Sequence, residues 1–162
     1  MSILLEKAKL LAKNNDLTKA FDSLLAAEAK GSAEASYAIG TWYLFGKHVK
    51  KDAHRAFQYF TKAGEKGNPN ALFNLAICYE KGTGVNKNLQ KAFKYYLEAY
   101  NHGDLKSAFE VGRMFYYGLG VIKNIDLAQT FINLSEKKLV PARKKDSKKL
   151  LKPSRSVSLH LF

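Results

Sequence analysis

The stretch GTGVNKN, residues 82–88, has the composition of a phosphate-binding turn. Its two glycines leave backbone amides accessible, and a helix pattern follows, whose positive dipole end attracts anions. The stretch lacks the lysine followed by serine or threonine that completes a P-loop, and no predicted strand precedes it. Similar turns begin at Gly46 (GKHVKKD) and Gly118 (GLGVIKN). A turn that recurs at a fixed interval is better explained as a structural connector than as a nucleotide site.

Other side chains that could do chemistry form no complete catalytic or metal-binding pattern. The single cysteine, Cys78, lies within a predicted helix, as buried structural thiols often do. SEKK from Ser135 matches the SxxK pattern of penicillin-recognising enzymes without its companion motifs. The histidines have no spacing that places metal ligands on one helix; they are His48, His54, His102 and His160. We therefore expect no enzymatic activity, no metal and no cofactor.

Length and composition indicate one globular domain. The chain has 162 residues, of which 46% are hydrophobic, enough to bury a core. One cysteine excludes an intrachain disulfide and favours a reducing compartment. No apolar run approaches the roughly 20 residues that span a membrane, and the amino terminus lacks the apolar core of a signal peptide. We expect a soluble, cytoplasmic, monomeric protein, with non-classical export left open.

The positive charge is concentrated near the carboxyl terminus. The formal net charge is +13, and residues 137–155 carry nine basic side chains against Asp146 alone. Spacings of four residues predict a basic stripe on one helix face, made of Lys144, Lys145, Lys148, Lys149 and Lys152. Such a stripe is usually a solvated face. Binding to an acidic protein, an anionic lipid surface or nucleic acid is the alternative.

An internal repeat of 36 residues organises the chain. Gly31, Gly67 and Gly103 lie at this interval, and a shift of 36 residues brings many other positions into register. The matching sets are Ile39, Leu75 and Val111; Gly40, Ala76 and Gly112; Tyr43, Tyr79 and Phe115; Gly46, Gly82 and Gly118; and Ala56, Ala92 and Ala128. The repeat therefore predicts one structural unit used several times.

Each period has the pattern of two antiparallel helices. Apolar and small residues recur at helical spacing on either side of the glycine turn, and the small ones permit close helix contact. Candidate N-caps precede the helices, namely Asp52, Asn68, Asn88, Asp104 and Asn124, and Asp16 lies 36 residues before Asp52. Pro69 stands at a first helical position, and the glycines at 31, 67 and 103 suit left-handed helix ends. In the first turn, His48 replaces the second glycine.

These units define a single predicted domain over residues 1–152. The helix pairs are expected at about residues 2–31, 32–67, 68–103 and 104–139, and Pro141 begins a capping helix over 140–152. A terminal cap is needed because the last repeat would otherwise expose its core face. Residues 153–162 form a carboxyl-terminal tail.

The repeated pattern resembles the Sel-one-like repeat (SLR), a relative of the tetratricopeptide repeat. The clearest copy is ALFNLAICYEKGTGVNKNLQKAFKYYLEAYNHG, residues 71–103, and the resemblance covers about residues 33–139. It implies an all-α, right-handed solenoid of about four helix pairs and a carboxyl-terminal capping helix. It also implies an adaptor or scaffold, mostly bacterial, that binds a protein or peptide. An immunity or effector protein of a bacterial secretion system is an alternative.

In tetratricopeptide-like stacks the first helix of each pair lines a concave groove. The resemblance assigns to this groove Tyr37, Thr41, Phe45, Phe73, Asn74, Ile77, Lys81, Phe109, Arg113 and Tyr117. Tyr37, Phe73 and Phe109 are equally explained as repeated packing residues. Thr41, Ile77 and Arg113 differ in chemistry at one repeat position, so we expect them to determine partner choice. The second hypothesis remains binding of nucleic acid or an anionic surface through residues 137–155.

Overall fold

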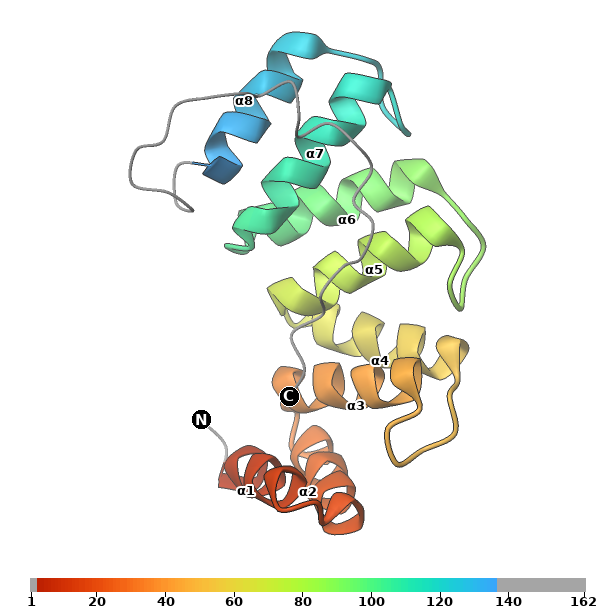
Figure 1. Cartoon of the computed structure of the whole chain (residues 1–162), viewed down its shortest axis with the longest axis vertical. Coiled ribbons are helices and arrows are strands. Elements are labelled where there is room, and N and C mark those ends of the chain that lie inside the picture. Colours follow the sequence, from red (N-terminus) through yellow and green to blue (C-terminus); the bar gives the residue numbers. More distant parts are fainter. Residues whose placement is uncertain (1–2, 137–162) are drawn as a thin grey trace.

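The structure, a computed structural model, describes residues 3–136 of the chain (Figure 1). Over these residues it contains eight α-helices and no strand. The helices are α1 (Ile3–Lys13), α2 (Leu17–Ala29), α3 (Ala33–Phe45), α4 (Ala53–Glu65), α5 (Pro69–Lys81), α6 (Leu89–Asn101), α7 (Leu105–Tyr117) and α8 (Ile125–Glu136). The prediction of an all-α repeat fold is confirmed. The expected cap over residues 140–152 and the tail over 153–162 lie outside the described residues.

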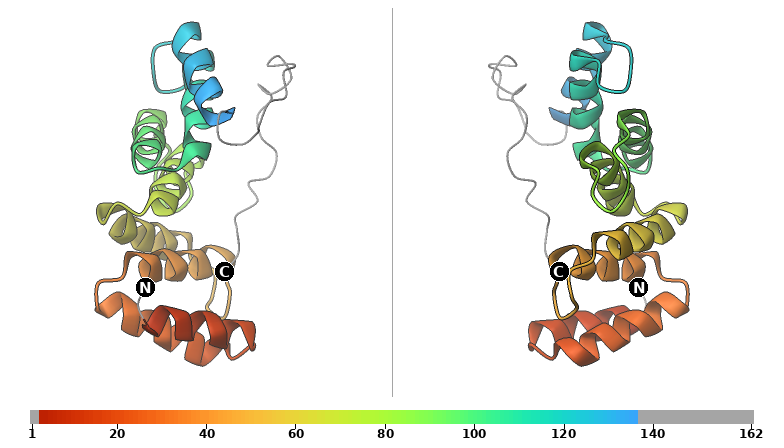
Figure 2. Two further views of the ribbon diagram at one scale, coloured as in Figure 1. Left: turned by 90° about the vertical axis from the view of Figure 1, so that its left-hand side faces the viewer. Right: turned by 90° about the vertical axis from the view of Figure 1, so that its right-hand side faces the viewer.

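The helices form consecutive antiparallel pairs that stack along the long axis of the molecule (Figure 1). The loops joining α3 to α4, α5 to α6 and α7 to α8 project from the same edge of the stack. Figure 2 shows that the helix axes turn progressively from the α1–α2 pair to the α7–α8 pair. Repetition of one unit with a small rotation therefore produces a superhelix.

The predicted caps begin most of the helices. The side chains of Asp52 and Asn88 each accept a hydrogen bond from the amide three residues later, at 2.9 Å. Pro69 is the first residue of α5, where its missing N–H costs nothing. Asp104 differs from the prediction, because its carboxylate accepts a hydrogen bond from the Ser107 hydroxyl at 2.5 Å and makes no side-chain bond to a backbone amide.

Small residues bring the two helices of a pair into close contact, as predicted. A Cβ atom on Gly40 would lie 2.7 Å from the ring of Phe60. One on Gly112 would lie 2.8 Å from the carbonyl oxygen of Ala128. Both distances are too short for a side chain, so a larger residue would separate the helices.

Two loop glycines bring the backbones of successive pairs into direct contact. A Cβ atom on Gly84 would overlap the carbonyl of Ala53 at the start of α4, and one on Gly120 would overlap the carbonyl of Leu89 at the start of α6. Both glycines have positive φ, +71° and +69°. These turns thus join neighbouring repeats.

In the loop between α3 and α4, a histidine stands where the later loops have the second glycine. His48 adopts φ +64°, the left-handed conformation that the glycines adopt in the other loops. Its ring packs against Phe21 of α2 and Trp42 of α3, with centroids 5.9 Å and 6.2 Å apart. The imidazole therefore fills space between the first two pairs.

A partly buried ionic network connects α5, α6 and α7. Arg113 donates from Nη2 to Oε1 of Glu80 at 2.6 Å and from Nε to Oε2 of Glu110 at 2.7 Å. The hydroxyl of Tyr96 donates to the other oxygen of Glu80 at 2.8 Å. The side chain of Arg113 is only 10% exposed, so its charge depends on these two carboxylates for compensation.

We expect Gly84→Ala to destabilise the fold more than Gly103→Ala. Both glycines have positive φ, so each substitution carries about 1–2 kcal/mol of backbone strain. Gly103 has no atom within 4 Å of a new Cβ, whereas Gly84 meets the Ala53 carbonyl, which adds about 1–3 kcal/mol. Urea unfolding followed by circular dichroism measures both. Equal losses would show that the close approach contributes nothing beyond φ.

We expect Glu80→Gln to reduce the free energy of unfolding by about 1–3 kcal/mol, because Arg113 loses a charged acceptor in a poorly hydrated place. Glu6→Gln is the control. It breaks the ion pair with Lys9 in α1, where the Glu6 side chain is 56% exposed, and should cost below about 1 kcal/mol. Thermal and urea unfolding of both variants test the difference. A loss for Glu80→Gln no larger than that for Glu6→Gln would contradict it.

Candidate functional site

The ten predicted groove residues all lie on the first helices of three pairs, α3, α5 and α7. Their exposure divides them into three groups. The buried ones are Tyr37, Asn74 and Arg113, the half-buried ones are Thr41, Phe73, Ile77 and Phe109, and the exposed ones are Phe45, Lys81 and Tyr117. Only the last two groups offer surface to a partner in this conformation.

Contacts inside the stack occupy the buried members. The ring of Tyr37 packs against Phe60 with centroids 5.9 Å apart, and only 8% of Tyr37 is exposed. Arg113 is equally buried and is held by Glu80 and Glu110. The sequence did not reveal this ion network, because Glu80 and Arg113 belong to different repeats. Their pairing is a property of the assembled stack.

Asn74 is buried with one hydrogen-bonding atom unsatisfied. Its side chain is 3% exposed, and its Nδ2 atom has no hydrogen-bond acceptor in the structure. A buried amide without an acceptor costs about 1–3 kcal/mol. The Tyr37 side chain is the polar group that interacts with this amide, and the interaction lowers the pKa of Tyr37 against the larger, raising effect of burial.

The half-buried members present mixed surfaces. The Thr41 hydroxyl donates a hydrogen bond to the Ala38 carbonyl at 2.6 Å. The methyl group of Thr41 is therefore the part of the side chain that a partner would contact. Phe73 makes an edge contact with Tyr96, with centroids 5.4 Å apart. Together with Ile77 they give α3 and α5 an apolar character that suits aliphatic or aromatic side chains of a partner.

The exposed members occupy one position in successive repeats. Phe45, Lys81 and Tyr117 are each the last residue of their helix and lie 36 residues apart. Phe45 is 49% exposed and Tyr117 is 47% exposed. Two large aromatic side chains with this exposure contribute little to the core. The predicted basic stripe, from Lys144 to Lys152, lies outside the described residues.

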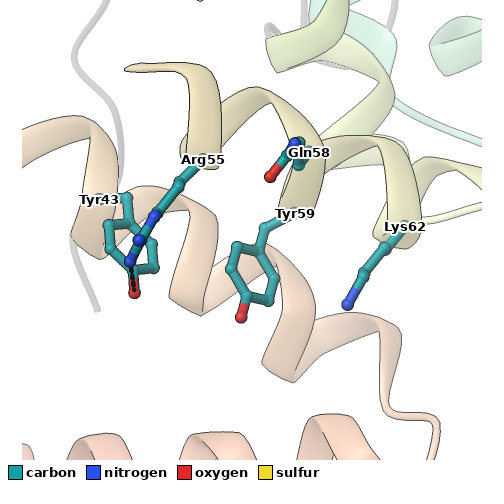
Figure 3. Close-up of a pocket in the computed structure, with 5 residues that line it drawn as sticks. All are labelled: Tyr43, Arg55, Gln58, Tyr59 and Lys62. Carbon is teal, nitrogen blue, oxygen red and sulfur yellow. Dashed lines mark hydrogen bonds between the residues drawn. The ribbon is translucent and has the colours of Figure 1, made fainter. Parts of the chain in front are cut away.

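A hollow that the sequence analysis missed lies beside α3 and α4. Tyr43, Arg55, Gln58, Tyr59 and Lys62 line it, and its volume is about 190 Å³ (Figure 3). The two tyrosine rings stack with centroids 5.7 Å apart and an interplanar angle of 11°. Repeated aromatic residues at 43 and 59 were visible in the sequence, but their stacking across two helices was not.

The candidate reactive side chains have structural surroundings. Cys78 is buried, and burial raises the pKa of its thiol to about 11, so it stays protonated near neutral pH. Within residues 3–136, no three His, Cys, Asp or Glu side chains group in a way that could hold a metal ion. Over the same residues, no helix has both the length and the apolar character needed to cross a membrane.

Comparisons with known proteins give a consistent family. The Sel1 repeat profile matches residues 33–68, 69–104 and 105–131. A Sel1 repeat protein from Oxalobacter formigenes is similar in structure, with a TM-score of 0.77 and 32% identity over 82% of this chain and 55% of its own. No curated protein matches the chain.

Two further solved structures are similar. The antigen c5321 of uropathogenic Escherichia coli, described as protective and as having an SLR fold, has a TM-score of 0.81 and 27% identity over 83% of this chain and 30% of its own. Cysteine rich protein B of Helicobacter pylori has a TM-score of 0.57 and 26% identity over 72% of this chain and 89% of its own.

The chain thus spans about half of the Oxalobacter protein and less than a third of the Escherichia coli antigen. Sel1 repeats in general form non-catalytic scaffolds for protein–protein interaction. The profile matches well over half of the residues, and the paired helices follow the same 36-residue period. The chain belongs to the Sel1 repeat family.

Proposed function

We propose that this protein is an adaptor that binds another protein or a peptide along the groove side of α3, α5 and α7, without catalysis. The observation that carries this proposal is the row formed by Phe45, Lys81 and Tyr117. These residues end three successive first helices and stay exposed, although two of them are large and aromatic. Partly exposed aromatic side chains in regular array are typical of binding surfaces.

The row provides two kinds of contact at a regular interval. Phe45 and Tyr117 provide aromatic rings at the ends of α3 and α7. Lys81, at the end of the intervening helix α5, provides a positive charge. An extended partner that passes along the stack would meet them in turn. Its apolar side chains would contact the rings, and an acidic side chain would pair with Lys81. The half-buried Ile77 and Phe73 would extend the apolar contact.

The bacterial sources of the three similar structures support a bacterial protein. The cytoplasmic location and the monomeric state stay predictions. Binding of nucleic acid or anionic surfaces by residues 137–155 is the competing hypothesis, and it rests on the charge of that segment alone.

We expect the double variant Phe45→Ala, Tyr117→Ala to lose a protein that the unchanged chain captures from a lysate of its source organism. Truncation of a binding hot spot costs more than about 1 kcal/mol, so two should weaken the identified complex by about tenfold or more. Mass spectrometry identifies the partner, and titration calorimetry measures the affinity. Both aromatic residues are half exposed, so the thermal unfolding midpoint should barely change.

Leu25→Ala is the matched control. Leu25 is 37% exposed and lies on α2, the second helix of the first pair, whereas the row lies on first helices of later pairs. It should retain the partner. Capture that is equal for all three proteins would contradict the groove proposal. Capture of nucleic acid that is lost on replacing Lys144, Lys145, Lys148 and Lys149 by Gln would favour the carboxyl-terminal segment instead.

A further inference from the structure

Two adjoining hollows beside the first Sel1 repeat share the residues Tyr43 and Arg55. The smaller has a volume of about 190 Å³ and extends along α4 to Tyr59 and Lys62. The larger has a volume of about 410 Å³ and extends into the loop at Val49, Lys50 and Lys51. We call the group formed by Tyr43, Lys50, Lys51, Arg55 and Tyr59 the Tyr43 site.

Hydrogen-bond donors converge in the Tyr43 site. Arg55 donates from Nη1 to the Tyr43 hydroxyl at 3.3 Å, and its Nε lies 3.5 Å from a carboxylate oxygen of Asp52. Figure 3 shows the ends of Tyr43, Tyr59, Arg55 and Lys62 pointing to the same side of the helices. Lys62 is already paired with Glu28 at 2.9 Å, and the others surround the hollow.

Several of these donors have no acceptor among residues 3–136. The Tyr43 hydroxyl accepts from Arg55, so its own hydrogen is available, and none of the interactions of the described residues uses the Tyr59 hydroxyl. Burial raises the pKa of Tyr59, so the phenol keeps its proton near neutral pH. Within residues 3–136, Lys50 and Lys51 form no ion pair.

Comparison of the three repeats shows which part of the tyrosine side chains the packing requires. The ring pair recurs in the second repeat as Tyr79 and Tyr95, 5.5 Å apart, and in the third as Phe115 and Phe131, 5.9 Å apart. Phenylalanine therefore satisfies the packing. The hydroxyls of the first repeat are not needed for it.

The positive charges of the site are partly repeated along the chain. Arg55 corresponds to Lys91 and then to Leu127, and Lys51 corresponds to Lys87 and then to Lys123. Lys62 corresponds to Glu98 and then to Leu134. The second repeat therefore keeps both hydroxyls and two of the cations, and the third repeat keeps only one cation. Lys50 distinguishes the first repeat, because Asn86 and Ile122 stand at its position in the later repeats. In the larger hollow Lys50, Lys51 and Arg55 face Asp52 as the one acidic lining residue.

From this arrangement we infer that the Tyr43 site is a second binding surface, separate from the groove of the proposed function, and that it takes carboxylate side chains of an acidic peptide segment. Arg55 and Lys51 would pair with carboxylates, and the two tyrosine hydroxyls would donate to their oxygens. The tyrosine rings and Val49 would cover the aliphatic stems. The surplus of positive charge in the larger hollow is complementary to such a segment.

Other occupants fit less well. Single-stranded nucleic acid needs open aromatic faces on which its bases can stack. The rings of Tyr43 and Tyr59 stack on each other, and Arg55 and Lys62 lie over them. A second copy of the chain is disfavoured because the protein has 27 basic and 14 acidic residues. Like charges would repel.

The test uses the full-length ¹⁵N-labelled protein and an acetylated, amidated hexaglutamate peptide. The expected result is a saturable change in the amide NMR signals of residues 49–55 and 59. Hexaglutamine, which lacks the charge, should cause no such change. The Phe45→Ala, Tyr117→Ala protein should bind hexaglutamate as the unchanged chain does, so this inference and the groove proposal succeed or fail separately.

Three variants locate the contacts. Lys51→Gln with Arg55→Gln should weaken hexaglutamate binding at these signals by about tenfold or more, because two charged pairs are lost. Lys87→Gln with Lys91→Gln removes the same charge from the equivalent positions of the second repeat and should change binding by less than about twofold. Tyr43→Phe with Tyr59→Phe keeps the rings, as the third repeat does, and should give an intermediate loss.

Several results would overturn the inference. They are signal changes confined to α7, α8 or residues 137–162, equal losses for the two charge variants, and equal responses to hexaglutamate and hexaglutamine. Displacement of hexaglutamate from the site by a lower concentration of oligothymidylate would instead identify a phosphate ligand.

Discussion

Backbone contact between a loop glycine and the preceding helix pair limits how closely successive pairs of the solenoid approach. The turn at Gly84 lies directly on the start of α4, and the turn at Gly120 lies on the start of α6. No side chain intervenes, so the spacing between these pairs does not depend on which residues cover the surface. Because each unit of a solenoid contacts only its neighbours, every interface needs a close contact of its own. At the first interface the ring of His48 provides the contact instead.

A spacing set by the backbone leaves other positions free to change. The stacked rings at residues 43 and 59 keep their geometry as tyrosine or as phenylalanine in later repeats. At the interface between the second and third repeats, Glu80 and Arg113 replace the Leu44 and Ile77 that stand at the corresponding positions one repeat earlier. A repeat family can therefore vary its surface chemistry on a constant frame. That property suits proteins whose function is to bind others.

The sequence predicted the local elements well. The helix pairs, the N-caps at Asp52 and Asn88, and the left-handed glycines all follow from side chains that act within four residues of themselves. Asp104 shows how narrowly such predictions can fail. It begins α7 as expected, but Ser107, three residues later, offers a hydroxyl that occupies its carboxylate. The Ser107 hydroxyl and the backbone amides at the start of α7 are alternative donors to this carboxylate, and the sequence pattern does not show which one it binds.

The candidate groove was less predictable. Its helices were identified, and Phe45 and Tyr117 are exposed. Arg113 could not be assessed in the same way, because its partner Glu80 lies 33 residues earlier on another repeat. The Tyr43 site escaped notice for a related reason. Its residues come from α3, α4 and the loop between them, and only packing shows that their donors converge.

By itself the sequence determined the period, the helix pairs, their caps and the family, because each depends on short-range hydrogen bonding or on a pattern repeated along the chain. Only the tertiary structure decided which polar side chains form hydrogen bonds or ion pairs within the stack and which can still bind a partner. That outcome depends on the rotation between successive pairs. The rotation sets which residues of neighbouring repeats meet, and it arises from the sum of many packing contacts that no single stretch of sequence contains.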